Sequence, residues 1–464
     1  MNKPEVCIPR SNNLNSSKTY TPLDDVSHIV ANKCSGQARS GETVVLKNTD
    51  FEDFVDQSHE DRTTSACIEL LNKGIDSSKH NLLEDAVNYF MECISKCHKF
   101  KNLLYIRIKA THMLAQSRKD MDDFSSAVNH FKEVLSLSKL MESDSIDTSS
   151  VYLSLANTLS IMNCIDEAIQ MYTECLSLYP DMYSAMYNRS MTYFGASRFT
   201  EAVAGFKEIT SKFSSSIEVN CVDALYYLGR SQELIGDVSS AFVNYSAVIK
   251  FDPHHVLANY QSGRIFYDSG SYEMAIECFS KVLQLKPHDY MCFYNRGMCF
   301  KMVKEQDKAF QDFENAILFN NKYVKAYVEA ARTNPNVSLR YYDEAISLAS
   351  NGIPYDDTAQ IYFERGVYYN HKKMYQEAVR DYSKCCEIDN THLESFFNRG
   401  AIYSRELNKT DLALQDFQFI LNQREDSQTL MERSFLYNTL GEPSLASLDL
   451  EKAERINRKD AEVR

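Results

Sequence analysis

The chain has 464 residues, more than a single hydrophobic core usually serves, so its length predicts several domains or one elongated array. It is 44% hydrophobic and 25% charged, which excludes disorder over the whole length. Its formal net charge of −14, with no run of Lys and Arg, argues against nucleic acid as a partner. No stretch of about 18 apolar residues occurs, so we expect no membrane insertion.

The cysteine content points to a reducing environment. The chain has 13 cysteines, an odd number, and residues 1–30 are polar where a secretory signal would be apolar. We therefore expect free thiols and an intracellular, cytoplasmic protein.

Residues 1–62 differ from the rest of the chain. They are rich in Ser, Asn, Thr and Asp and lack sustained helical periodicity, so they are predicted to be disordered. Within them, Phe51 and Phe54 stand among acidic residues. We hypothesise that this short segment folds back onto the remaining chain.

From residue 67 onward one pattern is repeated, most clearly in residues 256–287 and 290–321. Each copy has a small residue, and in most copies an alanine follows about twelve residues later and a large ring four residues after that. The small residues are Gly74, Ala115, Ala156, Ser190, Gly229, Gly263, Gly297, Ala331, Gly366, Gly400 and Ser434. The rings are Phe90, Phe131, Tyr172, Phe206, Tyr245, Phe279, Phe313, Tyr382 and Phe417.

This spacing predicts helical hairpins. Two antiparallel helices cross closely only where one backbone carries no bulky side chain, and a ring one turn away fills the space beside the contact. Gly236 and Gly270 stand where the first helix of a hairpin should end, a position that favours the left-handed conformation.

The pattern resembles the tetratricopeptide repeat, with Gly or Ala at the eighth position, Ala at the twentieth and Phe or Tyr at the twenty-fourth. The resemblance covers residues 67–460, about eleven units. It implies an all-α fold, an α-α superhelix or solenoid of stacked antiparallel helical hairpins. It also implies a groove that is lined by the first helices and binds proteins or extended peptide segments.

Departures from the regular spacing divide the array. We expect longer, irregular repeats over 63–221, regular repeats over 222–323, a degenerate repeat over 324–358 and further repeats over 359–464. Pro335 cannot continue a helix, so we expect a joint in the superhelix there. The last helix carries Glu451, Lys452, Glu454, Arg455 and Arg458 and is predicted to be a polar cap.

The sequence shows no motif for catalysis. It has no Gly-rich phosphate loop, nucleophile elbow, HExxH or CxxC pair, and the repeats occupy nearly all the folded length. Cys93 and Cys97 lie four apart on a helix, but no further ligand follows at a suitable spacing. The chain is therefore predicted to be no enzyme and to hold neither a cofactor nor a metal.

The fifth and sixth positions of the first helices should face the groove. Rings at the fifth position offer contact area at low entropic cost, and carboxamides at the sixth can donate to and accept from a peptide backbone. The alternative is that the rings pack within the hairpins. The predicted partner-binding residues are Tyr187, Asn188, Tyr226, Tyr260, Gln261, Tyr294, Asn295, Phe363, Phe397 and Asn398.

One known use of the family, a clamp for the C-terminal carboxylate of chaperones, is incomplete here. Glu329 stands where the clamp near Asn295 needs Arg, and Leu153 stands where the clamp near Asn188 needs Lys. We therefore expect a scaffold or adaptor, in an assembly such as a ciliary or transport complex. The alternatives are a substrate-selecting, non-catalytic subunit of an enzyme complex and, less favoured, a chaperone co-factor or an RNA-binding helical repeat protein.

Overall fold

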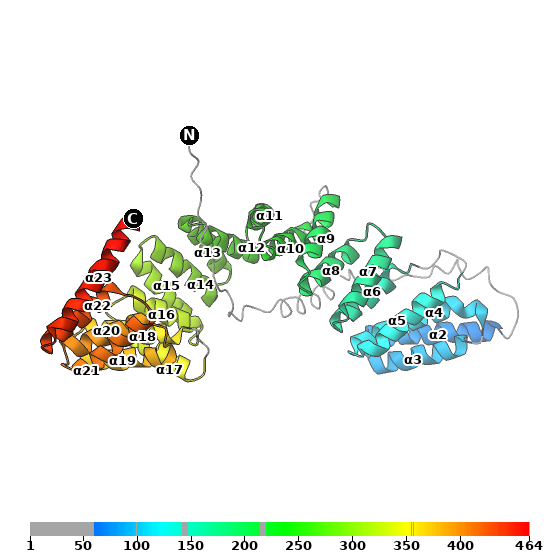
Figure 1. The fold of residues 1–464 in the computed structure, drawn as a ribbon. Helices are drawn as coiled ribbons and strands as arrows, with labels where there is room; N and C mark the ends of the chain where they lie inside the picture. The colour runs from blue at the N-terminus through cyan, green and yellow to red at the C-terminus, as the bar shows by residue number, and fades with distance from the viewer. Residues whose placement is uncertain are drawn as a thin grey trace. The chain divides into compact units, whose positions relative to one another are not determined.

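The structure, a computed structural model, describes residues 60–98, 100–141, 147–213, 220–353, 355 and 357–463 (Figure 1). Within these residues it has 22 α-helices and no strand, and it is 81% helical. The predicted all-α fold of antiparallel hairpins is confirmed. The segment around Phe51 lies outside the described residues, so its predicted disorder and fold-back stay predictions.

The described helices form two compact units. The first unit ends at Pro253 and contains five hairpins, each formed by two consecutive helices. Its helices are α2 (Glu60–Lys79), α3 (Leu83–Cys97), α4 (Leu104–Asp120), α5 (Phe124–Ser138), α6 (Ser149–Ile161), α7 (Ile165–Leu178), α8 (Tyr183–Gly195), α9 (Phe199–Lys212), α10 (Asn220–Leu234) and α11 (Val238–Phe251).

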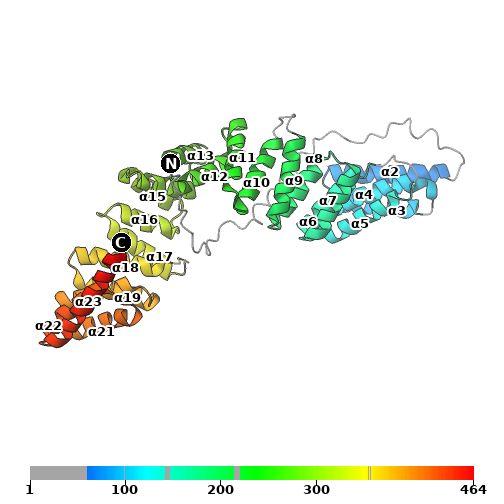
Figure 2. The same cartoon turned by 45° about the horizontal axis from the view of Figure 1, so that its top comes forward.

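The second unit begins at His254 and contains six hairpins (Figure 2). Its helices are α12 (Val256–Asp268), α13 (Tyr272–Leu285), α14 (Tyr290–Met302), α15 (Gln306–Phe319), α16 (Val324–Thr333), α17 (Ser338–Ser350), α18 (Thr358–His371), α19 (Tyr375–Ile388), α20 (Leu393–Arg405), α21 (Thr410–Gln423), α22 (Ser427–Thr439) and α23 (Pro443–Val463).

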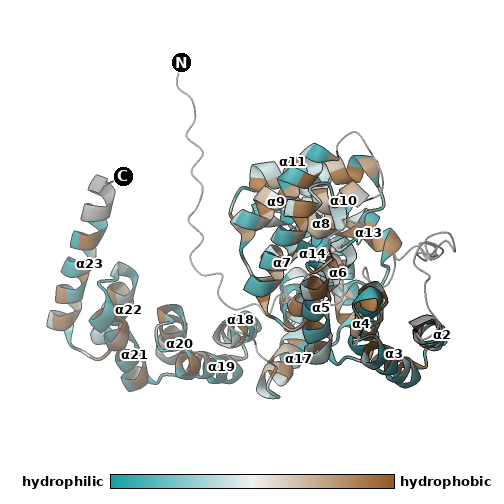
Figure 3. Ribbon diagram, turned by 90° about the vertical axis from the view of Figure 1, so that its right-hand side faces the viewer, coloured by the Kyte–Doolittle hydropathy of each residue, from teal (hydrophilic) through white to brown (hydrophobic). Residues whose placement is uncertain are grey.

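The eighth-position glycines and the rings meet as predicted. A Cβ added at Gly297 would lie 2.8 Å from the ring of Phe313, and one added at Gly366 would lie 2.8 Å from the ring of Tyr382. Both rings are fully buried. Helices such as α19, α20 and α21 carry hydrophobic and hydrophilic residues together (Figure 3), as expected for helices with one buried face.

The turn inside every described hairpin except that of α16 and α17 places one residue in the left-handed region. Gly236 and Gly270 have φ of +89° and +79°, which confirms the predicted helix ends. Other hairpins use non-glycine residues in this conformation, among them Lys304 at +65° and Lys373 at +61°. A missing glycine therefore does not mark a missing hairpin.

The chain remains well packed at Pro335, where we expected a joint. The proline shortens α16, but Ser338 Oγ donates to the carbonyl of Ala331 at 2.6 Å and so closes the broken helix end. One buried cluster runs from Ala309 to Ile361 across this turn. The division into two compact units falls after Pro253, within the segment expected to be regular, and the joint at Pro335 stays a prediction.

The last hairpin is polar only in part. Residues 451, 452, 454, 455 and 458 of α23 are exposed, as a polar cap requires. The same hairpin also exposes large apolar side chains, including Phe435 at 55% and Leu448 at 47%. In the part of the chain that is described, no helix is both long and apolar enough to cross a bilayer.

Four Arg–Asp pairs in the second unit were missed at the sequence level. The arginine precedes the small residue of the first helix, and the aspartate precedes the ring or large apolar residue of the second. Each arginine also reaches the second helix of the preceding hairpin; Arg399, for example, lies 3.0 Å from Ser383 Oγ. The pairs are Arg296–Asp312, Arg365–Asp381, Arg399–Asp416 and Arg433–Asp449.

Candidate partner-binding site

The fifth-position rings pack inside their own hairpins. Each lies against the twenty-fourth-position ring, as Tyr260 does on Phe279 with centroids 5.7 Å apart. The other centroid distances are 6.0 Å for Tyr187–Phe206, 5.9 Å for Tyr226–Tyr245, 5.9 Å for Tyr294–Phe313, 5.8 Å for Phe363–Tyr382 and 6.0 Å for Phe397–Phe417. The fifth-position rings therefore belong mainly to the packing inside the hairpins.

Burial of these rings is uneven along the chain. Tyr187, Tyr226 and Phe363 are buried, whereas Tyr260, Tyr294 and Phe397 are half-buried. Burial raises the pKa of Tyr260 to about 12. The half-buried rings therefore keep part of their surface open to solvent.

Carboxamides at the sixth position are held in fixed orientations. Asn295 Nδ2 donates to the hydroxyl oxygen of Tyr260 at 2.8 Å, and Asn188 Nδ2 donates to Asn157 Oδ1 at 2.9 Å. Both asparagines are half-buried, and neither Oδ1 accepts a hydrogen bond or is buried within the described residues. These oxygens are therefore oriented acceptors that solvent, or a peptide N–H group, can reach.

Other sixth positions are occupied by intramolecular contacts. Gln261 is buried and accepts from Arg264 Nη1 at 3.1 Å. Tyr227 is buried in an aromatic cluster, with its ring stacked on Phe206 at 6.0 Å. Asn398 is half-buried on α20. The predicted set is thus split between residues that can reach a partner and residues that fill the core.

The glutamates at the sixth position are paired with cations of neighbouring helices. Glu329, with a side chain 7% exposed, accepts from Lys301 Nζ at 2.6 Å and from Arg332 Nη1 at 2.6 Å. Arg332 in turn donates from Nε to Glu364 Oε2 at 2.8 Å. Gln360 also donates to Glu364, at 3.0 Å. This chain of bonds crosses α14, α16 and α18 and neutralises both carboxylates.

A serine and a histidine contact each other at the start of α20. Ser395 Oγ lies 2.9 Å from His392 Nδ1, but Ser395 is fully buried and its hydroxyl also donates to Cys385 Sγ. The same imidazole nitrogen accepts from the Ser395 backbone N–H at 3.3 Å, and His255 caps α12 in the same way. This geometry is a helix cap and cannot reach a substrate.

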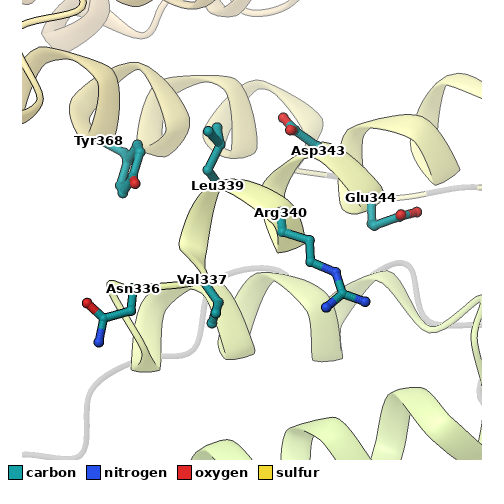
Figure 4. Close-up of a pocket in the computed structure, with 7 residues that line it drawn as sticks. All are labelled: Asn336, Val337, Leu339, Arg340, Asp343, Glu344 and Tyr368. Atoms are coloured by element: carbon teal, nitrogen blue, oxygen red, sulfur yellow. The ribbon is translucent and has the colours of Figure 1, made fainter.

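A shallow hollow of about 490 Å³ lies on α17 and the turn before it (Figure 4). Tyr368 enters from α18, and the lining has mixed charge, with Asp343 already bonded to Arg365 at 2.6 Å. The lining residues are Asn336, Val337, Leu339, Arg340, Asp343, Glu344 and Tyr368. None of them belongs to the predicted groove.

The structure supplies a third thiol that the spacing did not reveal. Cys67 on α2 lies beside Cys93 and Cys97 on α3, and the three sulfur atoms are all within 4.8 Å of one another. We expected no further ligand to follow Cys93 and Cys97 at a suitable spacing; Cys67 instead precedes them by 26 and 30 residues and reaches them only through the hairpin fold.

Comparison with known families supports the repeat assignment. Family models described as the tetratricopeptide repeat match residues 149–182, 223–255, 256–289 and 359–392. A human protein, DnaJ homolog subfamily C member 7, is 22% identical over 324 residues. The aligned region is 66% of this chain and 64% of that protein, so it spans less than two thirds of the relative.

Two solved structures are among those with partial similarity to this chain. The C-terminal part of a TPR repeat-containing protein from Cytophaga hutchinsonii is 21% identical, covers 52% of this chain and 97% of its own, and has a TM-score of 0.47. YrrB, described as a TPR protein with an unusual peptide-binding site, is 22% identical, with a TM-score of 0.35 over 41% of this chain and 94% of its own.

Proposed function

Because this chain is a tetratricopeptide-repeat protein, we propose that it is a non-catalytic scaffold that holds partner proteins on the face formed by its first helices. The family is typically a non-catalytic interaction fold. The observation that carries the proposal is the pair of oriented, reachable carboxamide oxygens at Asn188 and Asn295.

These carboxamides suit an extended backbone. An amide whose N–H already donates to an internal hydrogen bond holds its oxygen in one direction. A peptide N–H can therefore bond to this oxygen without a further loss of side-chain conformational entropy. The edges of Tyr260 and Tyr294 lie on the same first-helix face and add apolar contact area. Asn188 lies in the first compact unit and Asn295 in the second, so each unit has one such amide of its own.

The scaffold proposal extends to a place inside the cell and within a large assembly, such as a ciliary or transport complex. All eleven cysteines that the described residues contain are free thiols, which supports a reducing compartment. The net charge of −14 repels a phosphate backbone and so argues against nucleic acid as a partner.

The test is quantitative affinity capture with the intact chain as bait. Asn188→Ala combined with Asn295→Ala should reduce the recovery of partner proteins several-fold while circular dichroism stays unchanged. Gln311→Ala is the matched control, because Gln311 is an exposed amide on a second helix and should leave recovery unaltered.

Two outcomes would contradict the proposal or redirect it. Equal recovery with the double variant and the wild type would remove the first-helix face as the binding surface. Recovery of one catalytic subunit in a fixed ratio, with few other proteins, would favour the alternative of a substrate-selecting subunit of an enzyme complex.

A further inference from the structure

We propose that the hairpin of α2 and α3 binds a soft metal ion, Cu(I), through Cys67, Cys93 and Cys97. Their three sulfur atoms lie within 4.8 Å of one another and all three side chains are almost completely buried. Sulfur atoms about 2.3 Å from a shared ion in a trigonal plane stand about 4.0 Å apart, so a shift of less than about 1 Å closes the site.

Packing alone does not require thiols at these positions. The slot of Cys93 holds Val134, Val248 and Val282 in other hairpins, and all of them are fully buried. The slot of Cys67 holds Ser149 in the α6–α7 hairpin, and the slot of Cys97 corresponds to Ser138 at the end of α5. The chain thus builds the same hairpin elsewhere without this trio.

The positions of Cys67 and Cys93 are also in contact in the α6–α7 hairpin, where Ser149 and Cys175 occupy them. The hairpin fold itself therefore brings these two positions together. Cys93 Sγ donates to the carbonyl of Cys67 at 3.3 Å, and Cys175 Sγ donates to the carbonyl of Ser149 at 3.8 Å. Only the first hairpin has sulfur on both helices in this arrangement among the described residues. The backbone arrangement is therefore common to the hairpins, and the cysteines at these positions distinguish the first one.

Three thiols in an apolar pocket favour Cu(I) over Zn(II). Structural zinc is almost always four-coordinate, and no fourth His, Cys, Asp or Glu ligand joins the trio in the described part of the chain. Soft thiolate ligands select Cu(I), which accepts three sulfurs. Leu70, Phe90 and Leu103 belong to the surrounding buried cluster, which keeps water and oxidants from the ion.

Cations near the trio can offset its negative charge. The positive charges of Arg107 on α4 and of Lys96 only partly counter the overall rise in the pKa of Cys97 and of Cys67. The Nε atom of Arg107 is buried and has no hydrogen-bond partner within the described residues. The same guanidinium already pairs with Glu133 through Nη2 at 2.8 Å, so its Nε–H is left for a thiolate at Cys97.

Metal binding must release protons. Burial raises the pKa of Cys67 to about 12, and the hydrogen bond with Cys93 together with burial raises the pKa of Cys97 further. Cu(I) binds thiolates, so each coordinating thiol gives up its proton to solvent, and three thiolates with one Cu(I) leave a complex of charge minus two. No electron is transferred, and affinity should rise with pH.

The experiment uses the full reduced chain under nitrogen, titrated with Cu(I) in the presence of a competing chelator. We compare Cys67→Ser, Cys93→Val and Cys97→Ser, residues that this chain already uses in the equivalent slots, with Cys175→Val as the matched control. The wild type and the control should retain one more Cu(I) per chain than each site variant, whose affinity should fall by more than about tenfold.

Two further readouts decide the assignment. X-ray absorption should show three sulfur neighbours, and Cu(I) should raise the thermal midpoint of the wild type and of Cys175→Val but not of Cys93→Val. Equal Cu(I) retention in the wild type and all three site variants would overturn the proposal. Preferential binding of Zn(II) to the same three thiols would overturn the choice of metal.

Discussion

Tyr260 combines a packing ring with a polar hydroxyl that orients Asn295. Tyr260→Ala should lower the free energy of unfolding by about 2 to 4 kcal/mol, because it removes a half-buried ring from the face of Phe279. Tyr260→Phe keeps the ring and should stay within about 1 kcal/mol of the wild type. Urea unfolding followed by circular dichroism measures both.

The sequence left two interpretations of this ring open, contact with a partner and packing within the hairpin. If Tyr260→Ala proves as stable as the wild type, the ring does not belong to the core. If Tyr260→Phe alone weakens partner recovery, the hydroxyl acts by orienting Asn295.

Gly297 tests the register of the hairpins. A leucine there would drive its Cβ to within 2.8 Å of the ring of Phe313, so Gly297→Leu should cost about 1 to 3 kcal/mol through overpacking. Lys325→Leu adds the same side chain on the exposed face of α16 and is the control. Equal thermal midpoints for the two variants would contradict the assigned register.

Arg399 and Asp416 allow a test of a buried ion pair. Replacing Arg399 with Met leaves the buried Asp416 carboxylate without its cation and should destabilise the chain at pH 7 by about 3 to 5 kcal/mol. Arg380→Met, at an exposed site on α19, should have little effect. Urea unfolding of the two variants and the wild type compares them directly.

The cost should depend on pH. Burial raises the pKa of Asp416 despite the paired guanidinium, and loss of Arg399 should raise it further. A carboxyl whose folded pKa lies above its unfolded value of about 3.9 stabilises most below that pH and loses this contribution as the pH rises. The penalty of Arg399→Met should therefore be smaller at pH 4 than at pH 7, and the opposite order would contradict a buried charge.

At the scale of helices, the ion pairs across α14, α16 and α18 close the surface to a terminal carboxylate. A peptide with a free C-terminal carboxylate should bind the wild type no better than its amidated form, measured by fluorescence anisotropy. Glu329→Ala leaves Lys301 without its acceptor and should create a preference for the free carboxylate.

Glu305→Ala is the control for this variant, since Glu305 also pairs with a lysine, Lys308 at 2.5 Å, but outside the first helices. A preference for the carboxylate already present in the wild type would show that Glu329 does not block the site.

The sequence predicted the hairpins well because their determinants are local and repeated. A glycine and a ring sixteen residues apart, such as Gly297 and Phe313, report the same contact in hairpin after hairpin. The division after Pro253 was not predictable in this way, because it depends on how densely neighbouring hairpins pack.

The site was harder to predict from sequence than the fold. Periodicity places Tyr187 and Tyr260 on the same face but does not give the depth of burial, which depends on the neighbouring rings. The Arg–Asp pairs did leave a signal, since Arg296 and Asp312 are spaced like Arg365 and Asp381, but it requires aligning the repeats with one another first.

At the scale of the whole molecule, the two units should be separable. Each has its own buried clusters, and repeat arrays are stabilised mainly by contacts between adjacent hairpins. Residues 60–253 and 254–464, expressed separately, should each be helical and unfold cooperatively in thermal melts. An unfolded fragment from either side of Pro253 would show that the units depend on each other.

The arginines that join three helices bear on how the second unit would behave under tension. Arg433 bonds to Asp449 in its own hairpin and to Gln418 in the hairpin before it. Force applied to the C-terminal end therefore acts first on the hydrogen bonds of Arg433, which must break before the apolar contacts between the hairpins separate. Extension should proceed in discrete steps, each freeing about 110 to 120 Å of contour for a unit of some 34 residues. The second unit would thus unfold hairpin by hairpin under force and not in a single event.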